Sequence, residues 1–214
     1  MSRFKHILEQ DPQQIQQQNI PNDWPKVFPK SIVGLDRDGV INVNKGYISN
    51  PDDWEAIPGS LEAIRMIRLK GYKVVILTNQ GGIIKKEQTH DQVEAVHQRM
   101  MEVFGNAGIY SIDGLFYSET SLKCDCFAKP NLGMFHRAEK ELFLGKHRFK
   151  QNGFYVGDKM IDLKAAERIG ARPILVRTGH GLETEEDLKK FSREKLRKKT
   201  KVFDDLLQFA QRLP

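Results

Sequence analysis

The sequence predicts an α/β protein in which a parallel sheet carries helices on both faces. Short apolar runs, each long enough for one strand, alternate with longer stretches that have the spacing of helices. Strands that alternate with helices in this way form parallel sheets covered on both sides. Three of the apolar runs end directly in polar side chains, at Asp36, Thr78 and Asp158. Because ligands of such sheets bind beyond the carboxyl ends of the strands, we expect these three side chains to share one site.

The apolar runs locate the strands, and the stretches between them locate the helices. The first run includes Ile32 and Leu35, and a glycine at position 39 frees the turn that follows. The second is Tyr-Lys-Val-Val-Ile-Leu-Thr at 72–78, and a later one is Phe-Tyr-Val-Gly-Asp at 154–158. The complete expected order is a strand near 31–36, helix 59–70, strand 72–78, helix 89–106, strand 113–118, helix 131–144, strand 154–158, helix 161–169, strand 173–177, a charged helix 184–198, a short strand near 200–203 and a last helix to about 212.

Residues 1–30 are predicted to form a polar extension ahead of one domain that spans residues 31–214. The extension is rich in Gln and Pro, and either Trp24 and Phe28 anchor it to the domain or it is disordered. The chain has 214 residues, of which 39% are hydrophobic. That length and composition suffice for one α/β domain with a substantial core.

The composition is typical of a cytoplasmic protein. Mean hydropathy is −0.52, and no apolar stretch approaches the length of about 18 residues that a membrane span needs. Residues 1–19 lack the apolar segment of a signal peptide, so we expect the cytoplasm. The two cysteines, Cys124 and Cys126, are too close together for a disulfide framework. We expect a monomer.

The net charge of +6 is concentrated in one segment. Residues 187–201 contain eight Lys or Arg and two Asp or Glu, so the rest of the chain is neutral overall. A basic helix of this kind is most often a solvated face, and the alternatives are steering of an anionic substrate and contact with nucleic acid. Within the segment only Phe191 offers an aromatic ring for base stacking, so we do not expect nucleic acid as the partner.

Two carboxylates, Asp36 and Asp38, stand two residues apart where the first strand ends. Alternate residues of a strand point to the same side, so both carboxylates converge on one small site. Carboxylates this close repel each other unless a cation or a shared proton lies between them, and an Asp beside Mg²⁺ stays ionised and nucleophilic. The alternative is an acidic strand end that caps the next turn. Arg37 faces the opposite side of the strand, and we expect it to pair structurally.

Three further stretches carry the chemistry of a phosphate site. Residues 78–82, Thr-Asn-Gln-Gly-Gly, offer a hydroxyl and two amides to a phosphate. Lys129 supplies a fixed positive charge ahead of a helix, while Asp158 and Asp162 stand where another helix begins. Each stretch alone also fits an ordinary turn, a solvated lysine or a helix cap. Their combination and order, mostly at the ends of apolar runs, favour a catalytic set.

Taken together, these stretches resemble the haloacid dehalogenase (HAD) superfamily of aspartyl phosphotransferases. The nucleophile motif is Asp-Arg-Asp-Gly-Val at 36–40, and the metal motif is Gly-Asp-Lys-Met-Ile-Asp at 157–162. Within the superfamily the chain is similar to the histidinol-phosphate and D-glycero-D-manno-heptose-1,7-bisphosphate phosphatase group. The similarity covers residues 31–181, in the stretches LDRDGVINVNKGYISNPDDWEAIPG, ILTNQGGI, CDCFAKPNLGMF, YVGDKMIDLKAAERIGA and ILVRTGHG. It implies a three-layer, Rossmann-like HAD core.

The resemblance implies a catalytic role for individual residues. Asp36 attacks phosphorus and forms an aspartyl-phosphate, which divides the hydrolysis into two easier steps. Asp38 gives a proton to the leaving group and then takes one from the attacking water. Thr78, Asn79 and Lys129 stabilise the phosphate oxygens as charge spreads over them.

The resemblance also implies a metal site and a substrate site. Mg²⁺ is held by the Asp36 carboxylate, the Asp38 backbone carbonyl and Asp158, and Asp162 supports the metal-bound waters. The expected substrate-binding residues are Asn44, Lys45, Gly46, Tyr47, Asn79, Gln80, Gly81 and Lys159.

Two departures from the group's pattern bear on metal and substrate. The heptose phosphatases carry a zinc loop of the form Cys-x-His followed by Cys-x-Cys, and here Ser118 and Thr120 stand in place of the first pair. Because Cys124 and Cys126 alone do not complete a tetrahedral zinc site, we expect no zinc. The group's substrate-recognising Arg is Ala128 here, which removes a bidentate phosphate donor.

No large cap domain is expected over the site. The intervals 38–78 and 79–129 each include one predicted helix and leave too few residues for a separate folded domain. We therefore expect an open site that binds a small phosphorylated metabolite.

Three hypotheses about function follow. The first is a Mg²⁺-dependent phosphomonoesterase that acts on a heptose bisphosphate or a related sugar phosphate, with histidinol phosphate as the alternative substrate. The second is a polynucleotide end-phosphatase, which the open site and the basic helix allow. The third is a catalytically quiet binding module, and the intact catalytic set argues against it. Because the two altered features are those that read the substrate, the sequence leaves the leaving group open.

Overall fold

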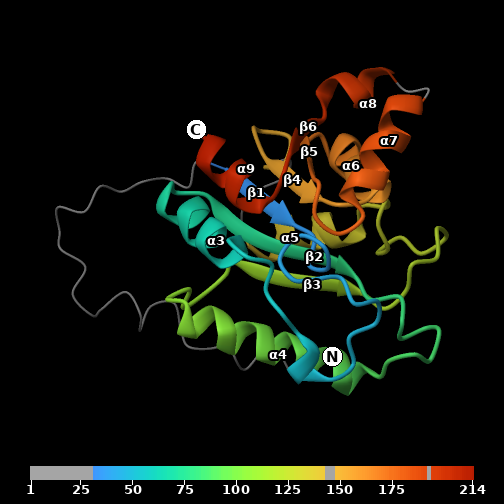
Figure 1. Ribbon diagram of the computed structural model, residues 1–214. Helices are drawn as coiled ribbons and strands as arrows, with labels where there is room; N and C mark the ends of the chain where they lie inside the picture. The colour runs from blue at the N-terminus through green and yellow to red at the C-terminus, as the bar shows by residue number, and fades with distance from the viewer. Residues whose placement is uncertain (1–30, 143–147, 192–193) are drawn as a thin grey trace.

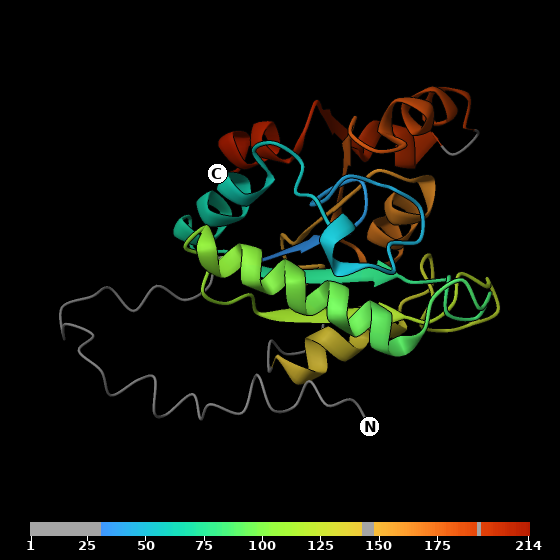
Figure 2. The same ribbon diagram turned by 60° about the horizontal axis from the view of Figure 1, so that its bottom comes forward.

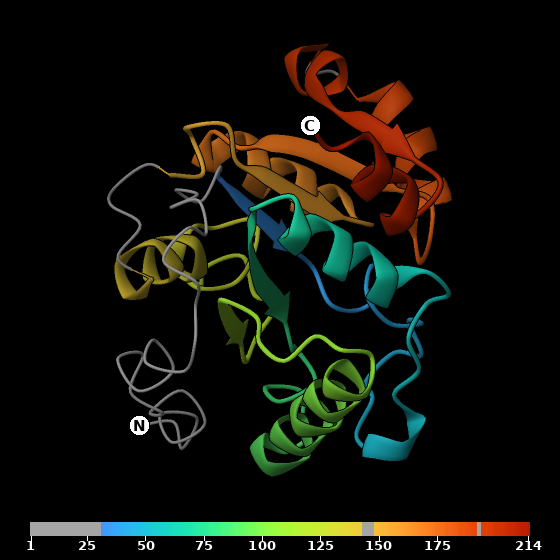
Figure 3. The same ribbon diagram turned by 90° about the vertical axis from the view of Figure 1, so that its left-hand side faces the viewer.

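The computed structural model describes residues 31–142, 148–191 and 194–214, so the predicted extension at 1–30 and its anchors Trp24 and Phe28 lie outside the described residues. Parallel strands form one sheet in the order β3-β2-β1-β4-β5-β6. They are β1 (Ile32–Leu35), β2 (Lys73–Asn79), β3 (Gly114–Ser118), β4 (Phe154–Gly157), β5 (Arg172–Val176) and β6 (Lys201–Phe203). Figure 3 shows β1, in blue, between β2 and β4. The predicted α/β class with a parallel sheet is confirmed.

Helices cover both faces of this sheet (Figures 1 and 2). They are α3 (Ser60–Leu69), α4 (His90–Asn106), α5 (Gly133–Glu141), α6 (Met160–Ile169), α7 (Gly181–Lys190), α8 (Glu194–Lys199) and α9 (Leu206–Arg212). Because side chains alternate along a strand, Val33 and Leu35 pack in a cluster with α3, α4 and α9, whereas Ile32 packs in a second cluster with α5 and α6. Within the described residues, none of these helices has both the length and the apolar composition that a bilayer crossing requires.

The single charged helix predicted over 184–198 is wrong, because α7 and α8 are separate helices. The backbone at Phe191 is extended (ψ 129°) and ends α7. The break lets Leu188 of α7 and Leu196 of α8 pack in one cluster with Leu175 of β5. The buried leucines set the position of this break, so the run of charged residues in the sequence does not reveal it.

The connections that could carry a cap are short, as predicted. Between β1 and α3 lies a loop with one 3₁₀ helix, η1 (Pro51–Asp53), which the side chain of Asn50 caps. The loop is tied to the strand end, because the N–H of Ile57 donates to the carbonyl of Ile41. Between β2 and β3 lies α4. In the described residues, neither connection forms a separate domain, so no cap domain covers the carboxyl ends of the strands.

Candidate active site

A pocket of about 270 Å³ opens at the carboxyl ends of β1, β2 and β4. Most of the predicted site residues line it, namely Asp36, Asp38, Asn44, Gly46, Tyr47, Thr78, Asn79, Gln80, Lys129 and Lys159. Ser121 lines it as well, from the loop 118–126 that was expected to contact the substrate, and so do Ile161 and His180, for which no role was predicted. Strand ends from distant parts of the chain therefore meet at one edge of the sheet, as the sequence pattern predicts.

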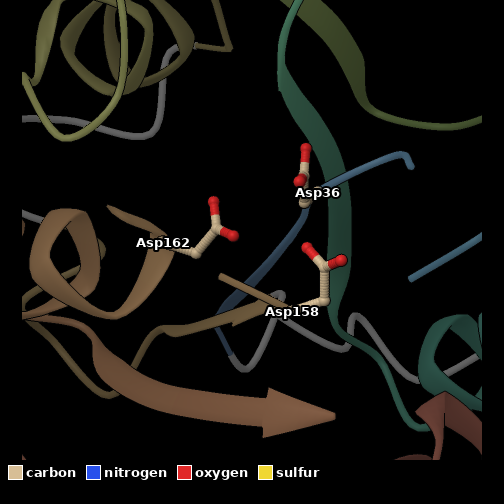
Figure 4. A group of neighbouring side chains, drawn as sticks. All are labelled: Asp36, Asp158 and Asp162. Carbon is tan, nitrogen blue, oxygen red and sulfur yellow. The ribbon is translucent and has the colours of Figure 1, made fainter. Parts of the chain in front are cut away.

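Three carboxylates form a cluster beside this pocket (Figure 4). One oxygen from each of Asp36, Asp158 and Asp162 lies within 4.8 Å of the others, and all three residues are buried. Figure 4 shows Asp36 at the end of β1 and the other two on the β4–α6 side of the site. Burial raises the pKa of Asp158 to about 7, and the neighbouring carboxylates of Asp36 and Asp162 add to the effect, although Lys159 opposes it.

The cluster fits a divalent cation. Asp158 Oδ1 is buried and has no hydrogen-bond donor, and the nearest ammonium, Lys159 Nζ, is 3.5 Å away. Buried carboxylate oxygens with free lone pairs are the ligands that hard cations such as Mg²⁺ take. A cation here would relieve the mutual repulsion of the three groups. Of the described residues, no other group of three His, Cys, Asp or Glu comes together in this way.

Lys129 supplies positive charge inside the cluster. Its Nζ lies 2.8 Å from Asp36 Oδ1 and 2.7 Å from Asp162 Oδ1, and it donates to the hydroxyl of Tyr155 at 2.9 Å. Burial alone lowers the pKa of Lys129, but the carboxylates of Asp162 and Asp36 outweigh burial and raise it. Lys129 is thus held as a cation.

Asn79 positions Lys129. Its Oδ1 accepts from the backbone N–H of Lys129 at 2.9 Å, and its Nδ2 donates to the backbone carbonyl of the same residue at 3.1 Å. Both the oxygen and the nitrogen of the Asn79 amide therefore make structural hydrogen bonds. Any direct contact of this amide with phosphate, as predicted from the sequence, would be made in addition to them.

Asp38 stands apart from the carboxylate cluster because a buried network holds its side chain. The Arg37 guanidinium donates to both oxygens, with Nη2 at 3.0 and 2.9 Å, and Arg37 is fully buried. Asn42 Nδ2 donates to Oδ1 at 2.9 Å, and Gln80 Nε2 donates to Oδ2 at 3.0 Å. Burial acts to raise the pKa of Asp38, but Arg37, Asn42 and Gln80 lower it below the ordinary value. The prediction that Arg37 pairs structurally is confirmed, whereas the expectation that it faces away from both carboxylates is wrong, because its guanidinium bonds Asp38.

The network continues into β2 and α4. Gln80 Nε2 also donates to Thr78 Oγ1 at 2.9 Å, and Gln80 Oε1 accepts from Arg37 at 3.1 Å. Arg37 Nη1 lies 3.0 Å from Nε2 of His97, a buried residue of α4. Because a guanidinium only donates, His97 Nε2 is the acceptor. Burial lowers the pKa of His97 well below its ordinary value, and Arg37 lowers it further.

Two glycines hold Asp158 close to the turn that follows Asp38. Gly39 (φ +87°) and Gly179 (φ +59°) both lie against Asp158 Oδ2, and a Cβ atom would be 2.2 Å from that oxygen on Gly39 and 2.3 Å on Gly179. His180 donates its backbone N–H to the same oxygen at 2.9 Å. Thr178 Oγ1 donates to the carbonyl of Gly39 at 2.6 Å. The turn at 178–180 is therefore bonded both to the turn after β1 and to Asp158 after β4.

Sequence reasoning gave no role to Thr178, Gly179 or His180. Their stretch, ILVRTGHG, is part of the resemblance, but no residue in it has the spacing of a catalytic motif. Because 139 residues separate Thr178 from Gly39, no local pattern reveals the contact. The signal that was available is the pair of polar residues directly after the apolar run that forms β5.

Lys45 and Gly81 differ from the other predicted substrate residues, because neither lines the pocket. Lys45 Nζ lies 2.9 Å from Glu55 Oε2 and donates to the carbonyl of Asp53 at 3.2 Å. Gly81 packs against Ser121, whose Oγ would be 2.3 Å from a Cβ at that position. Gly81 therefore allows the loop after β2 to approach the loop after β3, and Gly81 itself lies outside the pocket.

Tyr47 and Lys159 remain at the mouth of the site. The Tyr47 ring is 42% exposed, and Lys85 Nζ lies 5.4 Å from the ring centroid. Lys159 lines the pocket and is the ammonium nearest to Asp158. These side chains can contact a substrate without rearrangement of the sheet.

The loop after β3 carries hydroxyls where the zinc-binding pattern has Cys and His. Ser118 Oγ donates to the carbonyl of Thr120 at 3.1 Å, and both residues are buried. Cys124 and Cys126 are exposed free thiols. Ala128, which replaces the group's Arg, is fully buried and lines no part of the catalytic pocket.

Solved structures share this fold and provide the class of protein. The D,D-heptose 1,7-bisphosphate phosphatase from B. bronchiseptica, complexed with magnesium and phosphate, has a TM-score of 0.73 and 30% sequence identity, and the match covers 85% of this chain and 97% of that one. The D,D-heptose 1,7-bisphosphate phosphatase from Burkholderia thailandensis has a TM-score of 0.62 and 34% identity over the same shares. The protein is a phosphatase of the HAD type.

The family follows from the sequence. A family model described as polynucleotide kinase 3 phosphatase matches residues 31–205, and the chain belongs to this family. The D-glycero-beta-D-manno-heptose-1,7-bisphosphate 7-phosphatase of Haemophilus ducreyi is 35% identical over 169 residues, which are 75% of this chain and 90% of the relative. The same enzyme of Vibrio cholerae is 37% identical over 160 residues, or 70% and 83%. The predicted superfamily is confirmed, and the hypothesis of a quiet binding module is wrong.

Proposed function

We propose that the protein hydrolyses the phosphate ester of a small sugar in the presence of Mg²⁺, through an aspartyl-phosphate on Asp36. The observation that carries this proposal is the Asp36 carboxylate, which shares a buried cluster with Asp158 and Asp162 and pairs with Lys129. A nucleophilic carboxylate, oxygen ligands for a hard cation and a fixed ammonium are what phosphoryl transfer needs. The names of the relatives support a heptose bisphosphate or a related sugar phosphate as the substrate.

In the first half-reaction, Asp36 Oδ2 attacks phosphorus and the bond from phosphorus to the ester oxygen breaks. The other oxygen, Oδ1, accepts from the backbone N–H of Arg37 at 2.9 Å and pairs with Lys129 at 2.8 Å, so the attack falls to Oδ2. Lys129 stabilises the phosphate oxygens as negative charge spreads over them. Asp38 gives its proton to the leaving oxygen, and the negative phosphate beside it favours the protonated form in the complex.

In the second half-reaction, water attacks the phosphorus of the aspartyl-phosphate and the bond to Asp36 breaks. Asp38 takes the proton of that water, because it became a carboxylate when it gave its own proton to the leaving oxygen. Inorganic phosphate leaves, and Asp36 is again a free carboxylate. Thr78 lies in the same pocket and offers its hydroxyl to the phosphate.

Mg²⁺, when bound, supplies positive charge that offsets the negative phosphate oxygens. The ligands we propose are the carboxylates of Asp36 and Asp158 and the backbone carbonyl of Asp38. Asp162 holds the site together, since its Oδ2 accepts the backbone N–H of Lys159 at 3.0 Å and its Oδ1 pairs with Lys129.

The test is phosphate release together with trapping of the intermediate. A sugar phosphate labelled with ³²P is mixed with the protein and quenched in acid, with and without EDTA. We expect label on the wild-type protein in Mg²⁺, and neither label nor turnover in Asp36→Asn. The matched control is Asp91→Asn, which changes an exposed acid of α4 outside the pocket and should leave both unchanged. Full turnover of Asp36→Asn, or of the wild type in EDTA, would refute the mechanism.

A polynucleotide end-phosphatase is the second candidate function, and the description of the matching family model favours it. Acids in and next to the basic segment partly neutralise it, because Lys189 pairs with Glu186 at 2.7 Å and Lys198 with Glu194 at 2.8 Å. A 3′-phosphorylated oligonucleotide belongs in the same substrate panel. Release of its phosphate faster than that of every sugar phosphate would make this the function.

The partner we propose is a small phosphorylated metabolite, and we propose that the protein acts as a monomer in the cytoplasm. Among the described residues, one chain supplies the carboxylate cluster, Lys129 and the Asp38 network without a second copy. Size-exclusion chromatography with light scattering tests the monomer, and a mass of two chains would contradict it.

A further inference from the structure

A second hollow adjoins the catalytic pocket, with a volume of about 680 Å³. Asn44, Gly46 and His180 line both spaces, so the two lie side by side. The far wall of this hollow, which we call the side hollow, consists of Val43, Ile57 and Pro58. Pockets that take small molecules measure roughly 300–1,000 Å³. The catalytic pocket, at about 270 Å³, suits a phosphoryl group, and the side hollow has room for the rest of a substrate.

The side hollow is fixed relative to the reacting groups. Its remaining wall is the turn at 178–180, which Thr178 ties to Gly39 and which His180 ties to Asp158 through its backbone N–H. On the other side, Ile57 is held by its backbone bond to Ile41. A ligand in the side hollow would therefore lie at a set position from the carboxylate cluster, as a specificity site requires.

The lining has the character of a site for an uncharged ring. None of the described residues that line it is Asp, Glu, Lys or Arg. Val43, Ile57 and Pro58 offer a non-polar surface, and Asn44 and His180 offer hydrogen bonds at its edge. His180 Nδ1 lies 3.5 Å from Glu183 Oε2 and the side chain is 51% exposed, which leaves Nε2 to a ligand.

A second phosphate does not fit this lining. A dianion that leaves water needs charged donors in exchange, and the side hollow has none. Ala128, where the related phosphatases have an Arg, is buried and adds no donor to the catalytic pocket. Of the two lysines expected to bind substrate, Lys45 pairs with Glu55, and Lys159 lines the catalytic pocket beside Asp158 and not the side hollow.

We propose that the side hollow is the leaving-group subsite, and that it selects the ring form of a sugar monophosphate over the open chain and over the bisphosphate. The non-polar face of the ring lies on Val43, Ile57 and Pro58, and a ring hydroxyl bonds His180 Nε2. This inference rests on the proposed function, because the subsite has a role only if phosphorus is attacked at Asp36.

The experiment compares three matched substrates: a heptose 7-phosphate, the open-chain heptitol 7-phosphate and the heptose 1,7-bisphosphate. We expect the wild-type kcat/KM for the ring monophosphate to exceed each of the other two by about tenfold, the worth of one good hydrogen bond or one uncompensated charge. His180→Ala should lower the preference for ring over open chain by about tenfold, through KM. Pro58→Lys, at an exposed position of the wall, should shift the preference toward the bisphosphate by a similar factor.

The matched control is Leu182→Ala, two residues beyond His180, 63% exposed and outside both spaces. It should change none of the three constants, and circular dichroism should show all variants folded. If His180→Ala slows ring and open chain equally, or if the wild type prefers the bisphosphate, the subsite assignment is overturned while the phosphatase function stands. If the wild type releases phosphate from none of the three, the proposed function fails first.

Discussion

Replacing Arg37 by Met should remove the guanidinium from the Asp38 network and keep most of the side-chain volume. Arg37 is fully buried, donates to both oxygens of Asp38, and also bonds Gln80 and His97. Removing one partner of a buried ion pair leaves the other charge uncompensated and costs about 3–5 kcal/mol. We therefore expect Arg37→Met to lower the free energy of unfolding by that amount.

The assay is urea unfolding at pH 7, followed by far-UV circular dichroism. The matched control is Arg137→Met, because Arg137 also pairs with a carboxylate, Glu141, but at a side chain that is 53% exposed. An exposed pair is worth under about 1 kcal/mol. The double variant Arg37→Met with Asp38→Asn removes both charges and should regain a large part of the loss, which a double-mutant cycle measures. If Arg37→Met costs no more than Arg137→Met, the reasoning about the buried network is refuted.

Three further predictions follow from other parts of the site. His97 is neutral in the folded protein because its pKa is well below 6.5, so the unfolded chain takes up a proton below that pH and the folded one does not. His97 should therefore lower the free energy of unfolding by up to about 1.4 kcal/mol per unit below pH 6.5, while Asp158, whose pKa is raised to about 7, acts in the opposite direction. Urea unfolding of His97→Gln and of the wild type at pH 5.5 and 7.5 isolates the share of His97; a difference between the two proteins that does not change with pH would contradict a neutral His97. Gly179→Ala should weaken Mg²⁺ binding in calorimetry by more than about tenfold, because its Cβ would lie 2.3 Å from Asp158 Oδ2. The control is Gly108→Ala, since Gly108 also has a positive φ but has open space around it. Equal Mg²⁺ affinities of the two variants would show that the contact with Asp158 is harmless. Elemental analysis should find no stoichiometric zinc, because Cys124 and Cys126 lack the two further ligands of a tetrahedral site; one zinc per chain that Cys124→Ser removes would reveal a ligand not recognised here.

The strand ends could be predicted from the sequence because parallel topology brings them together by rule. Asp36 and Thr78 line one pocket, as expected from apolar runs that end in polar residues, and Asp158, at the end of a third run, lies in the carboxylate cluster with Asp36. The orientation of Asp38 could not be predicted in the same way. The period of two implies that Asp36 and Asp38 point alike, but β1 ends at Leu35, and beyond a strand that period no longer applies.

Roles that depend on contacts between distant segments were also beyond the sequence. The Asn79 side chain bonds the backbone of Lys129, fifty residues away, and His180 bonds Asp158. Lys45 is expected from the sequence to bind substrate, yet it pairs with Glu55 of the same loop. In each case the partner is chosen by tertiary packing, which residue type and spacing do not encode.

Lys129 bears on whether the protein can fold before a metal ion binds. Its ammonium lies against two of the three clustered carboxylates. The chain therefore carries its own counter-ion for this cluster. In small metal-dependent domains the ion supplies the folding energy, and chelators unfold the protein. Here the chain can fold around its own lysine first. Under the mechanism proposed above, the supply of magnesium would then govern how many molecules are active, without deciding how many are folded.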